Sequence, residues 1–116
     1  DARGSLDRER AMLSALREEA RLTQDRVRAA VFAADSGLRA AHETLSVAAT
    51  SADVASAVAE AERRRFDMGA VSLFVVNLRE QAAAEAQASL VDAQADTAIA
   101  DVEFRATIAD PELVGQ

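Results

Sequence analysis

The chain has 116 residues, a formal net charge of −7, 29 Ala, four Phe as its only aromatic residues, and no Cys. Few side chains are large enough to fill a globular core, whereas about a quarter of the residues are Ala, the strongest helix former. Four Gly and one Pro are too few for the turns of an all-β fold. The lack of Cys excludes disulfides and thiolate metal sites.

The negative charge is concentrated in the second half of the chain. Residues 1–66 hold 11 Arg against 11 acidic residues, whereas residues 67–116 hold two Arg against nine. Nucleic-acid binding needs a basic face that displaces counterions from phosphates. The charge pattern therefore argues against a nucleic-acid partner.

Apolar residues recur at a seven-residue step through the first half of the chain. One row comprises Leu6, Leu13, Ala20, Val27, Ala34, Ala41, Ala48 and Ala55, and a second comprises Val31, Leu38, Leu45, Ala52, Ala59 and Phe66. From Val27 onward the rows interleave at spacings of four and three, which predicts a helix packed lengthwise on other helices. Before Val27 the second row is polar, so we expect the contact face to narrow or rotate there.

We predict a disordered end over residues 1–5, with Ser5 as the cap, followed by one long helix over residues 6–68 of roughly 95 Å. The alternative is a break at residues 35–37, which include Gly37, or at residues 50–53, which resemble the capped start of a new helix. Because both heptad rows pass through these places without a phase shift, we favour a continuous or gently bent helix.

A tight turn is predicted over residues 69–72. Gly69 suits the left-handed residue that ends a helix, and the run of Arg at residues 63–65 lies where cations oppose the helix dipole. Ser72 can cap the next helix, while Val71 and Val76 can form an apolar staple across its start.

The second helix is predicted over residues 73–109, ended by Asp110 and Pro111 and followed by a tail over residues 110–116. It carries two rows of mostly small residues: Ala86, Leu90, Ala93, Thr97, Ala100, Phe104 and Ile108 in one, and Ala84, Ala88, Val91, Ala95, Ala98 and Val102 in the other. Two such rows indicate neighbours on two sides, as in a sheet of helices or the wall of a helical barrel.

The predicted fold is therefore all-α, an antiparallel hairpin of two long coiled-coil-like helices. A helix of about 63 residues cannot be covered by one of about 37, so the first helix must find other chains or other sequence. We expect the chain to associate with itself.

No chemistry-bearing constellation stands out in the sequence. His42 has no Cys or second His beside it, and Asp92 and Asp96, one helical turn apart, fit a solvated face better than an acid/base pair. We expect no enzyme activity, no cofactor and no metal.

Two segments are candidates for partner binding. The three consecutive Arg at residues 63–65 fit either a docking patch for an acidic partner or simple helix termination. The run Leu73-Phe74-Val75-Val76 is the one concentration of large apolar residues, and a hairpin core needs only two of the four positions buried.

From about Ala55 to Ala109 the sequence resembles the C-terminal hairpin of TolC-like outer membrane efflux proteins. Those proteins carry an Arg-aromatic pair, a turn glycine, a Ser or Thr three residues later, and then a helix with small residues at coiled-coil spacing. Here these features are Arg65-Phe66, Gly69 and Ser72, followed by Asn77-Leu78-Arg79-Glu80-Gln81 and an alanine-rich helix.

The resemblance implies a structural transport component. In the family, three protomers form an outer-membrane barrel that helices continue as a tunnel across the periplasm of a Gram-negative bacterium. The helix-turn-helix tips meet a periplasmic adaptor protein linked to an inner-membrane pump. The tip contact would comprise Gly69, Ala70, Val71 and Ser72, with Arg65 and Phe66 behind. The aspartate gate common in the family is not matched, since the nearby positions are Val75, Asn77 and Leu78.

Two other functions fit the residues. One is the hairpin of a periplasmic adaptor protein, which docks to such a channel but is usually flanked by lipoyl-like β segments. The other is a coiled-coil oligomerisation module in which the tip motif is a coincidence.

Overall fold

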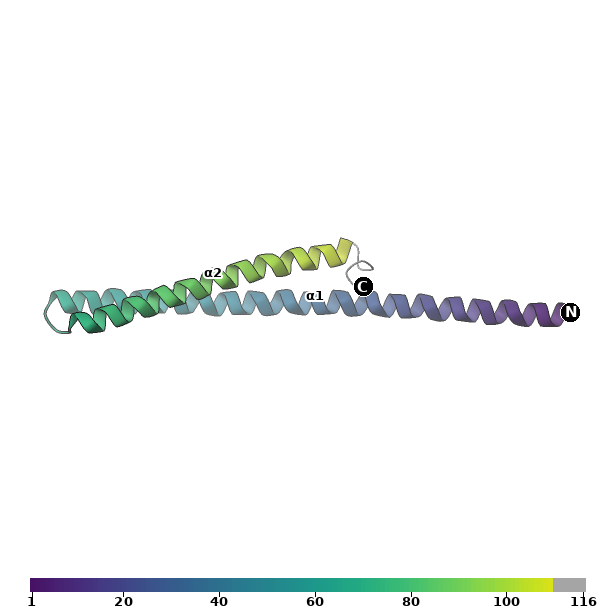
Figure 1. Ribbon diagram of the computed structural model, residues 1–116, viewed down its shortest axis with the longest axis horizontal. Helices are drawn as coiled ribbons and strands as arrows, with labels where there is room; N and C mark the ends of the chain where they lie inside the picture. Colours follow the sequence, from purple (N-terminus) through teal and green to yellow (C-terminus); the bar gives the residue numbers. More distant parts are fainter. Residues whose placement is uncertain (110–116) are drawn as a thin grey trace.

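The computed structural model describes residues 1–109, which form two antiparallel helices joined by a short turn (Figure 1). Helix α1 spans Ala2–Asp67 and helix α2 spans Leu73–Ala109. Together they make a rod with extents of 101 × 16 × 15 Å. The predicted all-α helical hairpin is therefore confirmed for these residues. The predictions for Asp110, Pro111 and the tail lie outside the described residues.

Helix α1 runs without a break for 66 residues, through both places where the sequence offered one. At Gly37 a helix loses about 1 kcal/mol relative to Ala. A break there would also interrupt the packing of the heptad rows on both sides. The burial along those rows outweighs the local preference for a turn, so the continuous helix forms.

The N-terminal prediction was wrong, because α1 begins at Ala2 and not after a disordered segment over residues 1–5. Asp1 is the N-cap, and its Oδ1 accepts a hydrogen bond from the Gly4 N–H at 2.6 Å. The Asp1 carbonyl also accepts from the Ser5 N–H at 3.0 Å. A carboxylate at this position satisfies an unpaired N–H and opposes the helix dipole, so Ser5 lies within the first turns instead of capping them.

The two heptad rows of α1 form the contact with α2, and we call this face the inner seam. Every row position from Val27 to Phe66 is buried or half-buried, with Ala52 and Ala59 the most enclosed. Most of the row residues are Ala. Small side chains allow two helix backbones to approach closely, at an interaxial distance of about 8 Å. The predicted seam is therefore confirmed over this range.

One of the two predicted rows of α2 faces α1. Ala93 and Thr97 are buried, and Ala86, Leu90, Ala100 and Phe104 are half-buried. The last member was assigned wrongly, because Ile108 is 55% exposed whereas Thr107 is 1% exposed. The heptad alternates steps of three and four, and the step after Phe104 is three residues, which places Thr107 on the seam.

Two threonines give the seam a polar element. The Thr97 hydroxyl lies 3.2 Å from the Ala41 carbonyl oxygen of α1 and 2.8 Å from the Ala93 carbonyl oxygen of its own helix. The Thr107 hydroxyl donates to the Glu103 carbonyl at 2.8 Å. Both buried hydroxyls thus have an acceptor, which removes the penalty of placing them between helices.

Helix α2 is too short to cover α1. It ends well before the N-terminal end of α1, as Figure 1 shows. Residues 2–26, which we call the overhang, are exposed except for the half-buried Gly4 and Thr23. Their large apolar side chains are open to solvent: Leu6, Met12, Leu13, Leu16 and Leu22. The predicted mismatch in helix length is present in the fold.

Substituting the fully buried Val76 tests how much the stability of the hairpin depends on the few larger side chains of the seam. Val76 is 0% exposed, whereas Phe74, two residues earlier, is 73% exposed. We expect Val76→Ala to lower the free energy of unfolding by about 2 kcal/mol, because it removes two buried methyl groups and leaves a cavity. Phe74→Ala should change it by less than about 0.5 kcal/mol. Urea unfolding followed by circular dichroism at one fixed protein concentration measures both; equal losses would contradict this packing.

Candidate functional site at the hairpin tip

The turn between the helices is closed by backbone hydrogen bonds around Gly69. The Gly69 N–H donates to the Phe66 carbonyl at 2.8 Å, and the Ala70 N–H donates to the Arg65 carbonyl at 2.8 Å. This pair of bonds is the Schellman motif, which requires a left-handed residue at its centre. Gly69 has φ 76°, the only positive φ among the described residues. The predicted role of Gly69 in the turn is confirmed.

Helix α2 starts from the backbone of Ser72. The Ser72 carbonyl accepts from the Val75 N–H at 3.1 Å and from the Val76 N–H at 3.5 Å. Val71 is half-buried and Val76 is fully buried. This burial fits the apolar staple expected across the helix start.

The residues predicted to meet a partner lie together at one end of the rod. Arg65, Gly69, Ala70 and Ser72 are exposed, and Phe66 and Val71 are half-buried. Phe66 occupies the last position of the inner seam, so part of its ring belongs to the hairpin core. The exposed members therefore form the accessible surface, and Phe66 supports it from behind.

The structure adds three large apolar side chains to this surface. Met68 is 75% exposed, Leu73 is 50% exposed and Phe74 is 73% exposed. Leu73 and Phe74 belong to the apolar run noted in the sequence, of which Val76 is buried and Val75 is half-buried. The sequence analysis did not identify Met68 as part of this surface. Met68 is the C-cap residue of α1, with φ −88° and ψ 1°, so it lies at the turn and not along the helix.

The arginine run divides into different roles. Arg63 donates to Glu80 of α2 and so ties the two helices together beside the tip. Arg65 donates to Glu62 one turn earlier at 3.1 Å. Arg64 is exposed and makes no ion pair within residues 1–109. Helix termination and helix pairing therefore account for two of the three, and Arg64 is left for solvent or a partner.

Glu62 interrupts the small-residue seam close to the tip. It continues the row that ends at Ala55, and its side chain is 15% exposed. One carboxylate oxygen accepts from Arg65, while the other, Oε2, is buried without a hydrogen-bond partner. A buried acceptor with no partner costs roughly 1–3 kcal/mol. The tip is thus the least satisfied part of the seam.

Both helices also carry an uncharged face that is left uncovered within residues 1–109. On α2 it is the second predicted row, Ala84 to Val102, which is exposed throughout. On α1 we call the corresponding face the outer stripe; it repeats at steps of three and four and comprises Ala30, Ala33, Gly37, Ala40, Thr44, Val47, Ser51, Val54 and Val58. All are exposed except the half-buried Ala30, and a Cβ built on Gly37 would meet no atom within 4 Å. The sequence reading missed this stripe because its Thr, Ser and Gly members hide the apolar periodicity.

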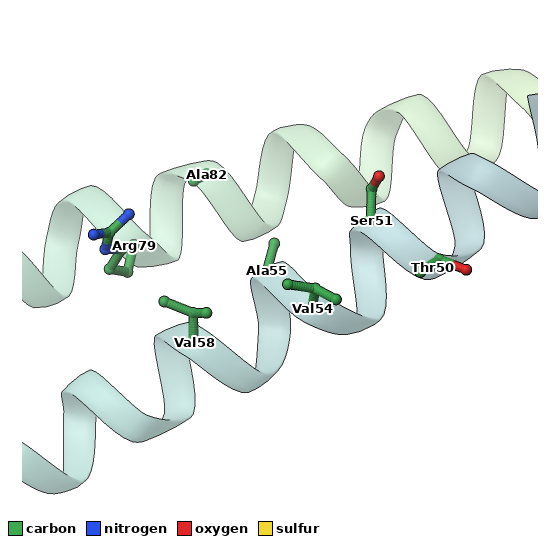
Figure 2. A pocket seen from close by; sticks show the side chains of 7 residues that line it. All are labelled: Thr50, Ser51, Val54, Ala55, Val58, Arg79 and Ala82. Carbon is green, nitrogen blue, oxygen red and sulfur yellow. The ribbon is translucent and has the colours of Figure 1, made fainter.

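An open groove lies where the outer stripe meets α2. Its walls are formed by Thr50, Ser51, Val54, Ala55 and Val58 of α1 and by Arg79 and Ala82 of α2 (Figure 2). Figure 2 shows Val54, Val58 and Ala55 on α1 along this groove, with the Arg79 side chain on the facing helix. The groove is mostly apolar, with the hydroxyl groups of Thr50 and Ser51 and the guanidinium group of Arg79 at its walls.

The other candidates from the sequence do not assemble into a site. Within residues 1–109 no three His, Asp or Glu side chains are grouped closely enough to hold a metal ion. His42 lines a shallow depression with Gln94 and Asp101. Within residues 1–109, neither helix contains a stretch with the length and hydrophobicity of a membrane-spanning segment.

No protein-family model, curated protein or solved structure matches the chain.

The unsatisfied Glu62 gives a stability test of the tip. We expect Glu62→Leu to raise the free energy of unfolding by about 1 kcal/mol, because it removes a buried acceptor and continues the apolar row, while Arg65 turns to solvent. Glu60→Leu, at an exposed position of the same helix, is the matched control and should change stability by less than about 0.5 kcal/mol. Thermal and urea unfolding measure both; a loss of stability in Glu62→Leu would show that its ion pair outweighs the unsatisfied oxygen.

Proposed function

We propose that the chain is a periplasmic helical hairpin of a TolC-like outer-membrane efflux channel. Its helices form part of the tunnel wall, and its tip docks to a periplasmic adaptor protein. The channel belongs to a Gram-negative bacterium and works as a homotrimer, and the adaptor couples it to an inner-membrane pump. The role is structural, with no cofactor.

The observation that carries the proposal is the surface at the end of the rod. A glycine-dependent turn presents three exposed apolar side chains, and an arginine next to them makes no ion pair within residues 1–109. Exposed aromatic and apolar groups beside an arginine are typical of the central residues of a protein interface. A tip that served only to reverse the chain would gain nothing from exposing Phe74.

The open faces of both helices support a place in a wall. A helix in the wall of a helical barrel contacts one neighbour on each side, so it needs two faces of small residues. Helix α2 has the inner seam on one side and the exposed row from Ala84 to Val102 on another, and α1 has the inner seam and the outer stripe. Two hairpins side by side would bury α2 of one against α1 of the next.

The residues just after the tip limit what can be proposed for the tunnel entrance. The positions just after the tip are Val75, Asn77 and Leu78, of which Asn77 and Leu78 are exposed. Because none of these residues is a carboxylate, the proposal does not include a ring of aspartates that closes the tunnel by binding cations.

Gly69 provides the functional test. In the full-length channel, Gly69→Val should impair efflux and adaptor binding while leaving membrane insertion intact. A β-branched residue at φ 76° costs at least about 1–2 kcal/mol and would open the Schellman turn. Drug sensitivity of cells, co-purification with the adaptor, and the amount of trimer in the outer membrane are the measurements.

The matched control is Ala29→Val, at an exposed position of α1 away from the tip, which should leave all three measurements unchanged. Phe74→Glu is the complementary variant, because it alters the exposed surface without changing the turn. Normal efflux in both Gly69→Val and Phe74→Glu would overturn the docking role. If the chain is instead the hairpin of an adaptor protein, it should bind the channel. If it is a simple oligomerisation module, it should bind neither the adaptor nor the channel.

A further inference from the structure

The overhang carries an apolar face that α2 does not reach (Figure 1). Leu6, Leu13 and Ala20 continue the first heptad row of the inner seam toward the N-terminus, and Leu16 lies three residues after Leu13. All four, which we call the leucine face, are exposed, Leu6 by 47% and Leu13 by 52%. Along the overhang the seam therefore lacks its second helix, and a helix of another chain can take that place.

Arginines flank the leucine face on one side. In the overhang the second heptad row consists of Arg3, Arg10, Arg17 and Gln24, where the rest of the seam has apolar residues. The three arginines are exposed, and none of them makes an ion pair within residues 1–109. A partner helix binds this face best if it places acidic side chains along the same flank.

The arginines argue against pairing of two overhangs. In an antiparallel pair of overhangs, Arg10 of each copy would lie beside Arg17 of the other, and like charges across an interface are unfavourable. In a parallel pair, the two α1 helices would continue side by side past Val27, where α2 already covers the seam. The partner of an overhang is therefore a different surface.

Helix α2 carries an exposed surface of the opposite charge. We call the members of its exposed second row the outer row: Ala84, Ala88, Val91, Ala95, Ala98 and Val102. Along one flank of the outer row lie exposed acids that make no ion pair within the described residues: Glu85, Asp92, Asp96 and Glu103. The α2 helix of a second copy thus offers an uncharged row to cover the leucines and carboxylates to meet the arginines.

The positions of these charges favour an antiparallel arrangement. Arg10 lies four residues after Leu6, and Asp92 lies four residues after Ala88 of the outer row. Both charges are therefore displaced in the same rotational sense around their own helix axes. When two such helices face each other, the charges meet on one side of the interface if the helices are antiparallel, and lie on opposite sides if the helices are parallel.

Side-chain size selects the register of this pair. Setting Leu13 opposite Val91 places each leucine against a smaller residue. The other opposed pairs are then Leu6–Ala98, Leu16–Ala88 and Ala20–Ala84. A shift of seven residues in one direction would set Leu16 against the polar Gln81, and the same shift in the other direction would set Leu6 against Arg105.

The same register brings the opposite charges together. Arg10 lies two residues, about 3 Å along the helix axis, from the position opposite Asp92, and Arg17 has the same relation to Glu85. Glu9, the one charged residue within the leucine face, falls opposite Ala95, whose small side chain leaves the carboxylate open to water.

We propose that this chain assembles head to tail, with the leucine face of one copy packed antiparallel on the outer row of the next and with Arg10 and Arg17 paired to Asp92 and Glu85. The contact of Thr97 with Ala41 fixes where α2 lies along α1, so neighbouring copies are displaced by about 50 Å. A displaced contact between two different surfaces repeats without closing. The assembly is therefore open-ended.

This assembly is a property of the chain itself and does not rest on the efflux proposal. It covers the outer row of α2, which a tunnel wall would also use. The head-to-tail assembly and the wall are therefore alternative uses of the same surface.

Cysteine cross-linking tests the direction and the register, because the native chain has no Cys. Ala20 and Ala84 face each other between copies in the proposed register, and both are close to Cys in size. We expect a chain with both Ala20→Cys and Ala84→Cys to form a ladder of disulfide-linked dimers, trimers and longer products under mild oxidation. Each single variant should form none, since neighbouring copies of one residue lie about 50 Å apart, far beyond disulfide reach.

The matched control combines Ala20→Cys with Ala98→Cys, because residue 98 lies on the same outer row about 21 Å from residue 84. It should form no ladder. Cross-links in this control, cross-links in Ala20→Cys alone, or no ladder with Ala84→Cys would each overturn the proposal. None of these results bears on the Gly69→Val test in the full-length channel, so the two proposals fail separately.

The charge pairing is tested by exchanging the charges. One variant carries Arg10→Glu and Arg17→Glu, and the other carries Glu85→Arg and Asp92→Arg. In sedimentation equilibrium the average mass of the native chain should rise with concentration from 12.3 kDa past that of a dimer. Each variant alone should need about tenfold more protein to reach the same average mass, because like charges then meet in the interface. An equimolar mixture should restore the native behaviour, since every contact between the two variants pairs opposite charges.

The matched control for charge is Arg8→Glu combined with Arg21→Glu, since both arginines are exposed on the far side of the overhang and the net charge changes equally. It should assemble as the native chain does. A native chain that stays monomeric or stops at a dimer would overturn the assembly, and a mixture that assembles no better than its components would overturn the pairing.

Discussion

The close approach of two helix backbones along a seam of small side chains is the constraint on which the rest of this structure depends. A seam made mostly of Ala buries little apolar area per residue, so its stability comes from length and not from a central core. The hairpin extends its few larger contacts, such as Val76, Leu90 and Phe104, over many turns. The result is a rod 101 Å long with no thick interior.

Packing along one seam leaves much of the surface of both helices uncovered. The inner seam accounts for one side of each helix, and a second uncharged face on each remains open. Ala, Gly, Ser and Thr on such a face expose little hydrophobic surface while still allowing close packing. The same faces also expose larger side chains, such as Val47 and Val102, and in the overhang Leu6, Leu13 and Leu16 are exposed as well, so the chain has apolar surface that a partner could cover.

The tip is stabilised by backbone hydrogen bonds and an ion pair, whereas the rod is stabilised by side-chain packing along the seam. Its backbone is fixed by Gly69 and the bonds to Phe66 and Arg65, and its flank by the Arg63–Glu80 ion pair. Because backbone hydrogen bonds stabilise the turn, the side chains around it are not needed for its stability and can be exposed. Glu62, half satisfied beneath them, is the exception to the otherwise uncharged positions of the inner seam from Val27 to Phe66.

The helices, the turn and the inner seam could all be predicted from the sequence. Heptad spacing depends on a period that every residue of a helix shares, and a left-handed turn residue without strain is nearly always Gly. One prediction was wrong because the last heptad step was taken as four residues instead of three, which assigned Ile108 and not Thr107 to the seam. Another was wrong because Asp1 and Ser5 can both cap a helix, and Asp1 is the one that does. The resemblance to efflux channels also came from the sequence, and it remains a proposal.

Which faces of the helices stay uncovered depends on how α1 and α2 pack, and the sequence did not reveal it. Thr44, Ser51 and Gly37 read as ordinary surface residues until α2 is in place and the outer stripe is seen to be uncovered. The groove beside Arg79 and the unpaired oxygen of Glu62 likewise depend on where one helix lies against the other. Periodicity fixes which residues share a face of a helix, but the lengths and crossing of two helices determine which of those faces is covered.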